Sequence, residues 1–150
     1  MTNEAIKTHI SALVPSAVFD ETGEWLNLLV EEKDWRQLAL ELRNSTLSFD
    51  YLFCVTCIDW KTQLTMVYHL SSTTYRNSMV VKVNLNRDQP GIDTVSDIWR
   101  TAEFHEREVY ELFGVQFRNH PDLRKLILTD DFEGYPLRKD FEDPINMIKL

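Results

Sequence analysis

The chain has 150 residues, 43% of them hydrophobic and 27% charged, which is enough for one domain with a single core. No apolar run approaches the roughly 20 residues of a membrane-spanning helix, and the first residues lack the basic start and apolar middle of a signal peptide, so we expect a cytoplasmic protein. The formal net charge of -8 argues against nucleic acid as a partner.

The first part of the chain predicts alternating helices and strands. Residues 3–13 place apolar side chains at helical spacing. Residues 17–19 and 25–30 flank the turn-like segment 20–23, a pattern typical of a two-stranded hairpin. From residue 34 to about 44, apolar and charged residues mix as on an amphipathic helix.

Two strongly alternating segments follow, at residues 64–70 and 79–85. Their period of two predicts strands, and the polar stretch between them can close an antiparallel hairpin. Residues 87–91 contain Pro and Gly and break the second strand. We expect a helix from near Thr94, whose hydroxyl can cap its first turn, to Gly114, which ends it.

Beyond Gly114 the chain has no sustained periodicity, and prolines and glycines fall among charged residues. The predicted fold is therefore α+β: one two-layer domain with a small mixed or antiparallel sheet packed by helices, plus an irregular C-terminal arm. We assign residues 1–114 to the core and residues 115–150 to an arm that docks on another protein. A basic series in the arm could meet an acidic partner: Arg118, Arg124, Lys125, Arg138 and Lys139.

Cys54 and Cys57 form a Cys-x-x-Cys pair, which can be a redox dithiol or half of a metal site. They are the only cysteines, so a four-thiolate site is excluded, and although His69 could add a ligand, the zinc-finger spacing is absent. Their neighbours are strongly apolar, which favours small buried thiols. A redox role stays open as an alternative.

The stretch HEREVYELFG, residues 105–114, concentrates ionisable side chains on the last predicted helix. On a helical projection Arg107, Glu108 and Glu111 point away from the apolar stripe. Glu103 and Glu111 each lie four residues from Arg107, so we expect exposed ion pairs on that side.

Glu106 differs, because it falls on the apolar stripe, where a carboxylate is costly unless it is paired. We expect it to lie away from water and to pair with Arg124 or Arg138 of the arm. The alternative is that Glu106 acts as a general acid or base. His105 and His120 are also candidates for a base, but neither has the partners of a nucleophilic triad. No phosphate-binding glycine motif occurs anywhere in the chain.

The segment from Trp99 to Phe141 resembles the 30 kDa subunit of NADH:quinone oxidoreductase, which is the C-type subunit of respiratory complex I. Two blocks carry the resemblance, an acidic and basic block on the predicted helix and a Gly-x-Pro-Leu-Arg-Lys-Asp block in the arm. Tyr135 stands where many relatives have histidine, and the two cysteines are outside the family pattern. The matching residues, which we take as structural and interface residues, are Glu106, Arg107, Glu108, Glu111, His120, Pro121, Arg124, Gly134, Pro136, Leu137, Arg138, Lys139 and Asp140.

The resemblance implies a non-catalytic subunit in the hydrophilic arm of a proton-translocating NADH:quinone oxidoreductase, bracing the quinone-reducing module. It implies partner subunits of the D, B and I types, a peripheral place on the cytoplasmic face of the bacterial inner membrane, and flavin and iron–sulfur clusters in the partners only. Two alternatives remain. One is the equivalent subunit of a membrane-bound hydrogenase or another complex-I-like oxidoreductase, and the other is an autonomous dithiol or metal protein.

Overall fold

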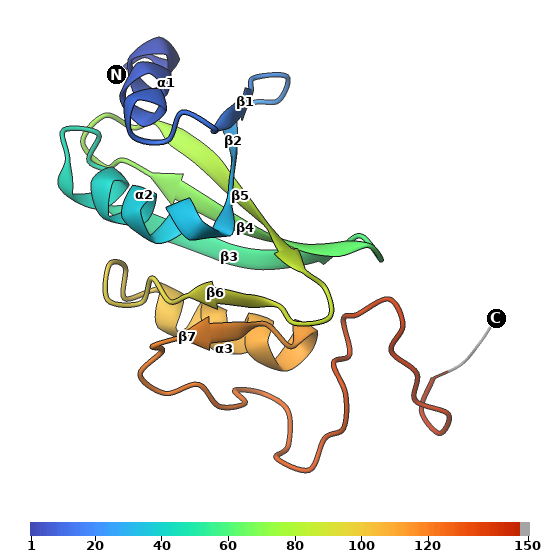
Figure 1. Ribbon diagram of the computed structural model, residues 1–150. Helices are drawn as coiled ribbons and strands as arrows, with labels where there is room; N and C mark the ends of the chain where they lie inside the picture. The colour runs from blue at the N-terminus through green and yellow to red at the C-terminus, as the bar shows by residue number, and fades with distance from the viewer. Residues whose placement is uncertain (148–150) are drawn as a thin grey trace.

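The computed structural model describes residues 1–147, and within them the chain forms three helices and seven strands (Figure 1). No helix in this part of the chain is long and apolar enough to cross a membrane. In chain order the elements are α1 (Asn3–Leu13), β1 (Val18–Asp20), β2 (Leu26–Val30), α2 (Glu32–Asn44), β3 (Tyr51–Asp59), β4 (Gln63–Ser71), β5 (Ser78–Asn86), β6 (Gly91–Asp93), α3 (Ala102–Phe113) and β7 (Gln116–Arg118).

Five strands form one mixed sheet in the order β1-β2-β5-β4-β3. Strands β2 and β5 are parallel, whereas the other neighbours are antiparallel. Both predicted hairpins, β1–β2 and β4–β5, are confirmed, as is the α+β class with a mixed sheet packed by helices. Strands β6 and β7 form a separate parallel pair.

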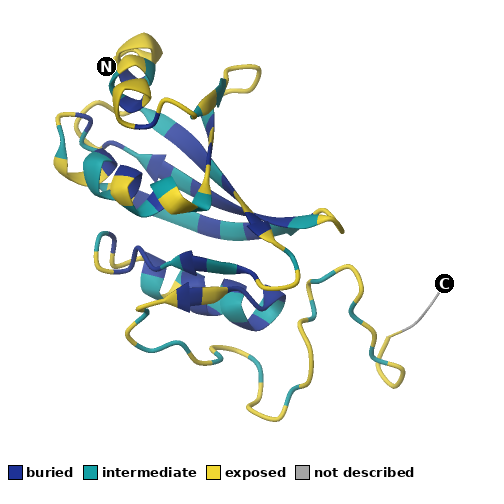
Figure 2. Ribbon diagram, in the orientation of Figure 1, coloured by how far each residue is buried: buried dark blue, intermediate teal, exposed yellow. Residues whose placement is uncertain are grey.

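The core lies between one face of the large sheet and the helices (Figures 1 and 2). Alternate residues of β4 point to this side, which is why Met66 and Tyr68 are fully buried. Trp35 of α2 packs on Tyr68 with ring centroids 4.4 Å apart. Among the described residues, no helix lies over the opposite face of the sheet in Figure 1.

Three features of the fold differ from the prediction. Strand β3 was not predicted as a strand, because its apolar run carries little alternation. Helix α3 begins at Ala102 and not near Thr94, because the intervening residues form turns and the Thr94 hydroxyl bonds a side chain of α3. Residues 115–118 belong to the core, since Val115 and Phe117 are buried and β7 pairs with β6.

From residue 119 to 147 the arm is irregular, as predicted, and it runs beneath α3 in Figure 1. Figure 2 shows that most of its residues are exposed or half-buried. The last three residues of the predicted arm, 148–150, lie outside the described residues.

Candidate functional site

Helix α3 positions the arm, and Gly114 decides where the helix ends. Gly114 has a φ of +80°, which only glycine adopts readily, and its N–H closes the helix on the carbonyl of Tyr110. A Cβ at this position would lie 2.7 Å from the ring of Tyr135. Glycine is therefore required both for the turn and for the close contact with the arm.

Glu106 is 0% exposed, as predicted, but its predicted arginine partner is wrong. Its carboxylate accepts a 2.5 Å hydrogen bond from the Thr94 hydroxyl and a 2.9 Å bond from the N–H of Val95. Burial raises the pKa of Glu106 to about 7, against the effect of these two donors. Neither Arg124 nor Arg138 reaches it, because α3 directs the side chain towards the turn that precedes the helix.

His120 fastens the beginning of the arm to the same helix. Its Nδ1 accepts from the N–H of Asp122 at 3.0 Å, so Nε2 carries the proton and donates to the carbonyl of Glu103 at 2.9 Å. The Nε2 atom also lies 3.7 Å from Glu106, and both side chains are shielded from solvent. These bonds give His120 a positioning role.

The helical projection placed Arg107 on an exposed face of the helix, and this prediction is wrong. The residue is 5% exposed, and its guanidinium donates to the carbonyls of Arg124 and Lys125, at 3.0 Å each. It also lies 5.5 Å from the ring centroid of Phe104. Among residues 1–147 it forms no ion pair with either predicted acidic partner.

The prediction that Glu111 is exposed is wrong as well. It is 1% exposed, and its carboxylate accepts from the backbone N–H groups of three consecutive residues, Leu126, Ile127 and Leu128, at 2.9 to 3.1 Å. Glu108, in contrast, is half-buried. The arm thus covers a second face of α3, and two charged side chains bind its main chain there.

The second sequence block binds the end of α3. The N–H of Leu137 donates to the carbonyl of Leu112 at 3.1 Å, and Nε of Arg138 donates to the carbonyl of Phe113 at 2.6 Å. The Arg138 guanidinium also lies 5.4 Å from the ring centroid of Tyr135. Because the last carbonyls of a helix lack partners within it, these donors satisfy groups that would otherwise need water.

Asp59, which was not among the predicted site residues, connects the arm to the large sheet. It is 3% exposed and accepts from Arg87 at 2.9 and 2.8 Å and from the N–H of Lys139 at 2.9 Å. Arg87 also lies 3.3 Å from Asp140. The Arg87 guanidinium holds the pKa of Asp59 well below its usual range. The signal in the sequence that could have identified Asp59 was its position as a single carboxylate at the end of an apolar segment.

The remaining predicted site residues contribute less. Arg124 is exposed and its guanidinium pairs with Asp122, at 3.0 Å. Pro121 is exposed and Pro136 is half-buried, and Gly134 supports a turn with a φ of +84°. Their contribution is to shape the backbone between the anchoring points.

Cys54 and Cys57 cannot act as a dithiol in this fold. They lie three residues apart on β3, so they point to opposite faces of the sheet, with Cys57 in the core and Cys54 half-buried. Their Cα atoms are roughly 10 Å apart, beyond the reach of a disulfide. Burial raises the pKa of Cys57 to about 12 and also raises the pKa of Cys54, which favours the unreactive thiol.

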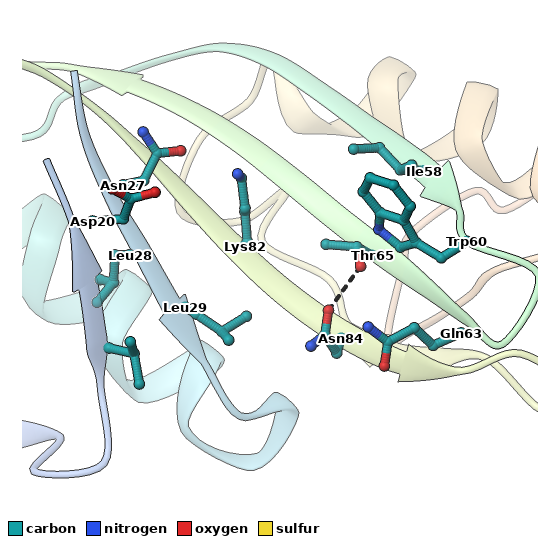
Figure 3. A pocket seen from close by; sticks show the side chains of 11 residues that line it. Asp20, Asn27, Leu28, Leu29, Ile58, Trp60, Gln63, Thr65, Lys82 and Asn84 are labelled. Atoms are coloured by element: carbon teal, nitrogen blue, oxygen red, sulfur yellow. Dashed lines mark hydrogen bonds between the residues drawn. The ribbon is translucent and has the colours of Figure 1, made fainter. Parts of the chain in front are cut away.

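A pocket of about 310 Å³ lies on the sheet face opposite the helices (Figure 3). Leu29, Ile58 and Trp60 supply much of its apolar surface, and Asp20 and Lys82 are its charged residues. Thr65 also lines it, and its hydroxyl donates to Oδ1 of Asn84 at 2.7 Å. Within residues 1–147 no three His, Cys, Asp or Glu side chains gather in a way that could hold a metal ion.

The chemistry of the α3 site is therefore one of anchoring. Glu106 and Glu111 each face donors supplied by this chain's own backbone or a hydroxyl, and Arg107 faces carbonyls. Side chains with such partners hold a neighbouring segment in place. The two sequence blocks come together in space as the contacts that hold the arm.

Comparison with known proteins shows the family to which the chain belongs. The family model described as respiratory-chain NADH dehydrogenase, 30 Kd subunit, matches residues 28–145. The C/D-type subunit of the NADH-quinone oxidoreductase of Phocaeicola vulgatus is 47% identical over 103 residues, covering 67% of this chain and 20% of that protein. The C-type subunit of the Chloroherpeton thalassium enzyme is 39% identical over 117 residues, covering 75% of this chain and 49% of that protein.

A solved structure extends the likeness to the fold. A chain of the membrane-bound sulfane sulfur reductase, an archaeal respiratory membrane complex, superposes with a TM-score of 0.81 at 31% identity, over 93% of this chain and 85% of that one. This chain spans only about a fifth and a half, respectively, of the two curated relatives above. The family match covers most of its length, and the chain belongs to the family of the 30 kDa subunit of respiratory-chain NADH dehydrogenase.

Proposed function

We propose that this chain is a structural subunit in the peripheral arm of a proton-translocating NADH:quinone oxidoreductase, where it braces the quinone-reducing module. In this role the chain takes part in oxidoreduction only as a member of the complex. The catalytic groups, the flavin and the iron–sulfur clusters belong to its partner subunits, and this chain itself carries no cofactor.

The proposal rests on one observation, which is that the family's charged residues bind groups of this chain itself. Arg107 and Glu111 are buried and bind main-chain groups of the arm, and Glu106 binds the turn before α3. A general acid or base needs a proton-transfer partner in a substrate, whereas these groups have partners within the chain. These contacts therefore favour a role in shaping a docking surface over a role in catalysis.

We further propose partners of the D, B and I types and a position on the cytoplasmic face of the bacterial inner membrane. The name of the Phocaeicola relative, which contains both C and D, supports the D-type partner, because it names a C part and a D part in one protein. Two parts of one chain are held at high effective concentration, which favours an interface between them.

The test is isolation of the tagged full chain from native membranes of its own organism. We expect NADH-oxidising and quinone-reducing subunits to co-purify, and we expect membranes lacking the chain to lose NADH:quinone activity until it is restored. The isolated chain should contain neither flavin nor stoichiometric iron or zinc. One cofactor per chain, lost when Cys54 and Cys57 are replaced by serine, would contradict the structural role.

A second candidate assembly follows from the structural likeness to the sulfane sulfur reductase complex. The same subunit fold then serves a complex-I-like oxidoreductase with another electron donor or acceptor, such as a membrane-bound hydrogenase. The same purification separates the two candidates. NADH-oxidising subunits among the co-purified proteins support the first, and hydrogenase or sulfane-sulfur-reducing subunits in their place support the second.

A further inference from the structure

The arm presents an apolar tip that is exposed and yet firmly held. Ile127 is 71% exposed and Leu126 is 39% exposed, so neither side chain is used to fill the core. Their N–H groups, together with that of Leu128, are bound to the buried carboxylate of Glu111. The backbone of the tip is therefore fixed from behind while its side chains face solvent.

The contacts behind the tip are costly ones for a protein to maintain. Burying a charged group is unfavourable unless its partners compensate, and here both Arg107 and Glu111 are buried at this one segment. Arg107 binds the carbonyls of Arg124 and Lys125, immediately before the tip. A segment fixed in this way loses little conformational freedom when it binds, which favours binding.

The charges around the tip point to the character of the partner. The segment LILTDDFEGYPL, residues 126–137, contains Asp130, Asp131 and Glu133 but no Lys or Arg, and all three carboxylates are exposed. The ammonium of Lys125 is directed back into the loop, where it binds three carbonyls, the closest at 2.7 Å on Phe132.

The contacts of the basic series favour a basic partner surface at the tip over the acidic one expected from the sequence. Arg118 is paired with Asp93 and Glu32, Arg124 with Asp122, and the Arg138 guanidinium binds a helix carbonyl. Most of the basic series is thus neutralised or occupied within the chain. Arg124 and Lys125 keep their charges, but residues 122–133 carry four carboxylates against these two cations, so the net charge around the tip is negative.

We propose that Leu126 and Ile127 form the apolar anchor of an interface, received by an apolar pocket with a Lys- and Arg-bearing rim on a companion subunit of the same complex. The proposal rests on the proposed structural function and adds the residues that dock and the chemistry of the partner surface. A central apolar anchor surrounded by polar groups is the usual anatomy of such an interface.

The test measures binding of the full chain to native membranes from cells that lack it. Ile127→Ala, alone and with Leu126→Ala, is compared with Ile145→Ala, a matched loss of a strongly exposed apolar side chain elsewhere in the arm. We expect the anchor variants to bind at least about tenfold more weakly and the control to bind like wild type. Thermal unfolding of the isolated chains should be unchanged, because the truncated side chains are exposed.

Two further measurements identify the partner surface. A photo-crosslinking residue in place of Ile127 should join one companion subunit, at a peptide with apolar residues flanked by Lys or Arg. Replacing Asp130 and Asp131 with Asn and Glu133 with Gln should weaken binding at low salt and reduce its salt dependence. A crosslink to an acidic or uncharged surface, or salt dependence that persists in this variant, would overturn the basic rim.

The outcomes also separate this inference from the proposed function. If wild type and anchor variants bind equally well, the anchor is wrong while the structural role stands. If wild type binds no subunit of the complex, the structural role itself fails. If anchor variants and the Ile145→Ala control all bind more weakly to the same degree, the arm acts through general apolar contact and the specific anchor is refuted.

Discussion

Glu111→Gln provides the sharpest test of how the arm is held. The carboxylate of Glu111 accepts from three consecutive N–H groups, at Leu126, Ile127 and Leu128. Glutamine keeps one acceptor oxygen, but it removes the charge and turns an NH₂ group towards backbone donors. A hydrogen bond to a charged group contributes roughly 1.5–3 kcal/mol, and a buried donor left without a partner costs about 1–3 kcal/mol.

The variant should therefore lower the free energy of opening the arm from α3 by roughly 2–4 kcal/mol. Limited trypsin digestion reports this opening, because the peptide bonds after Arg124 and Lys125 have their carbonyls bound by Arg107 in the closed state. When opening is fast, cleavage follows the open population. Cleavage at these two sites should then rise by roughly 30- to 800-fold.

Glu108→Gln is the matched control, since it makes the same substitution on the same helix at a half-buried side chain. It should leave the cleavage rate near that of wild type. Equal rates for the two variants would refute the reasoning, because removing any carboxylate of α3 would then have the same effect. Rapid cleavage of wild type at Arg124 and Lys125 would refute it as well, since the arm would already be open.

Three other variants test the remaining contacts. Burial raises the pKa of Glu106 from 4.5 to about 7, so the folded state holds the proton of Glu106 more tightly than the unfolded state does. The free energy of unfolding of the wild type should therefore fall by about 3 kcal/mol as the pH rises from 4.5 to 7. Denaturant titrations should show this pH dependence for the wild type and lack it for Glu106→Gln. Gly114→Ala should destabilise by more than about 1 kcal/mol in thermal unfolding, with partial recovery when Tyr135 is also truncated to alanine. Arg87 lowers the pKa of Asp59, so the ionised Asp59 stabilises the fold above pH 3.8, and this stabilisation is lost as the pH falls below that value. Asp59→Asn should therefore be less stable than wild type at neutral pH. Its free energy of unfolding should also fall less than that of wild type when the pH is lowered.

The regular elements were determined largely by local sequence pattern. Period-two alternation marked β4 and β5, helical spacing marked α1 and α2, and the position of Glu106 on the apolar stripe predicted its burial. These patterns are local because a strand or helix repeats its own geometry every few residues, and one buried face is enough to reveal it. The family blocks were likewise visible in the sequence.

The tertiary structure alone decided which partners the charged residues have. The helical projection of α3 assumed one buried face, but the arm covers a second, so Arg107 and Glu111 are buried rather than exposed. Their partners are backbone N–H and carbonyl groups, which every residue carries and which therefore leave no mark in the sequence. Asp59 and Lys139 meet across 80 residues of chain for the same reason. How an irregular segment folds back on a helix depends on the sum of such contacts, and no local repeat reveals it.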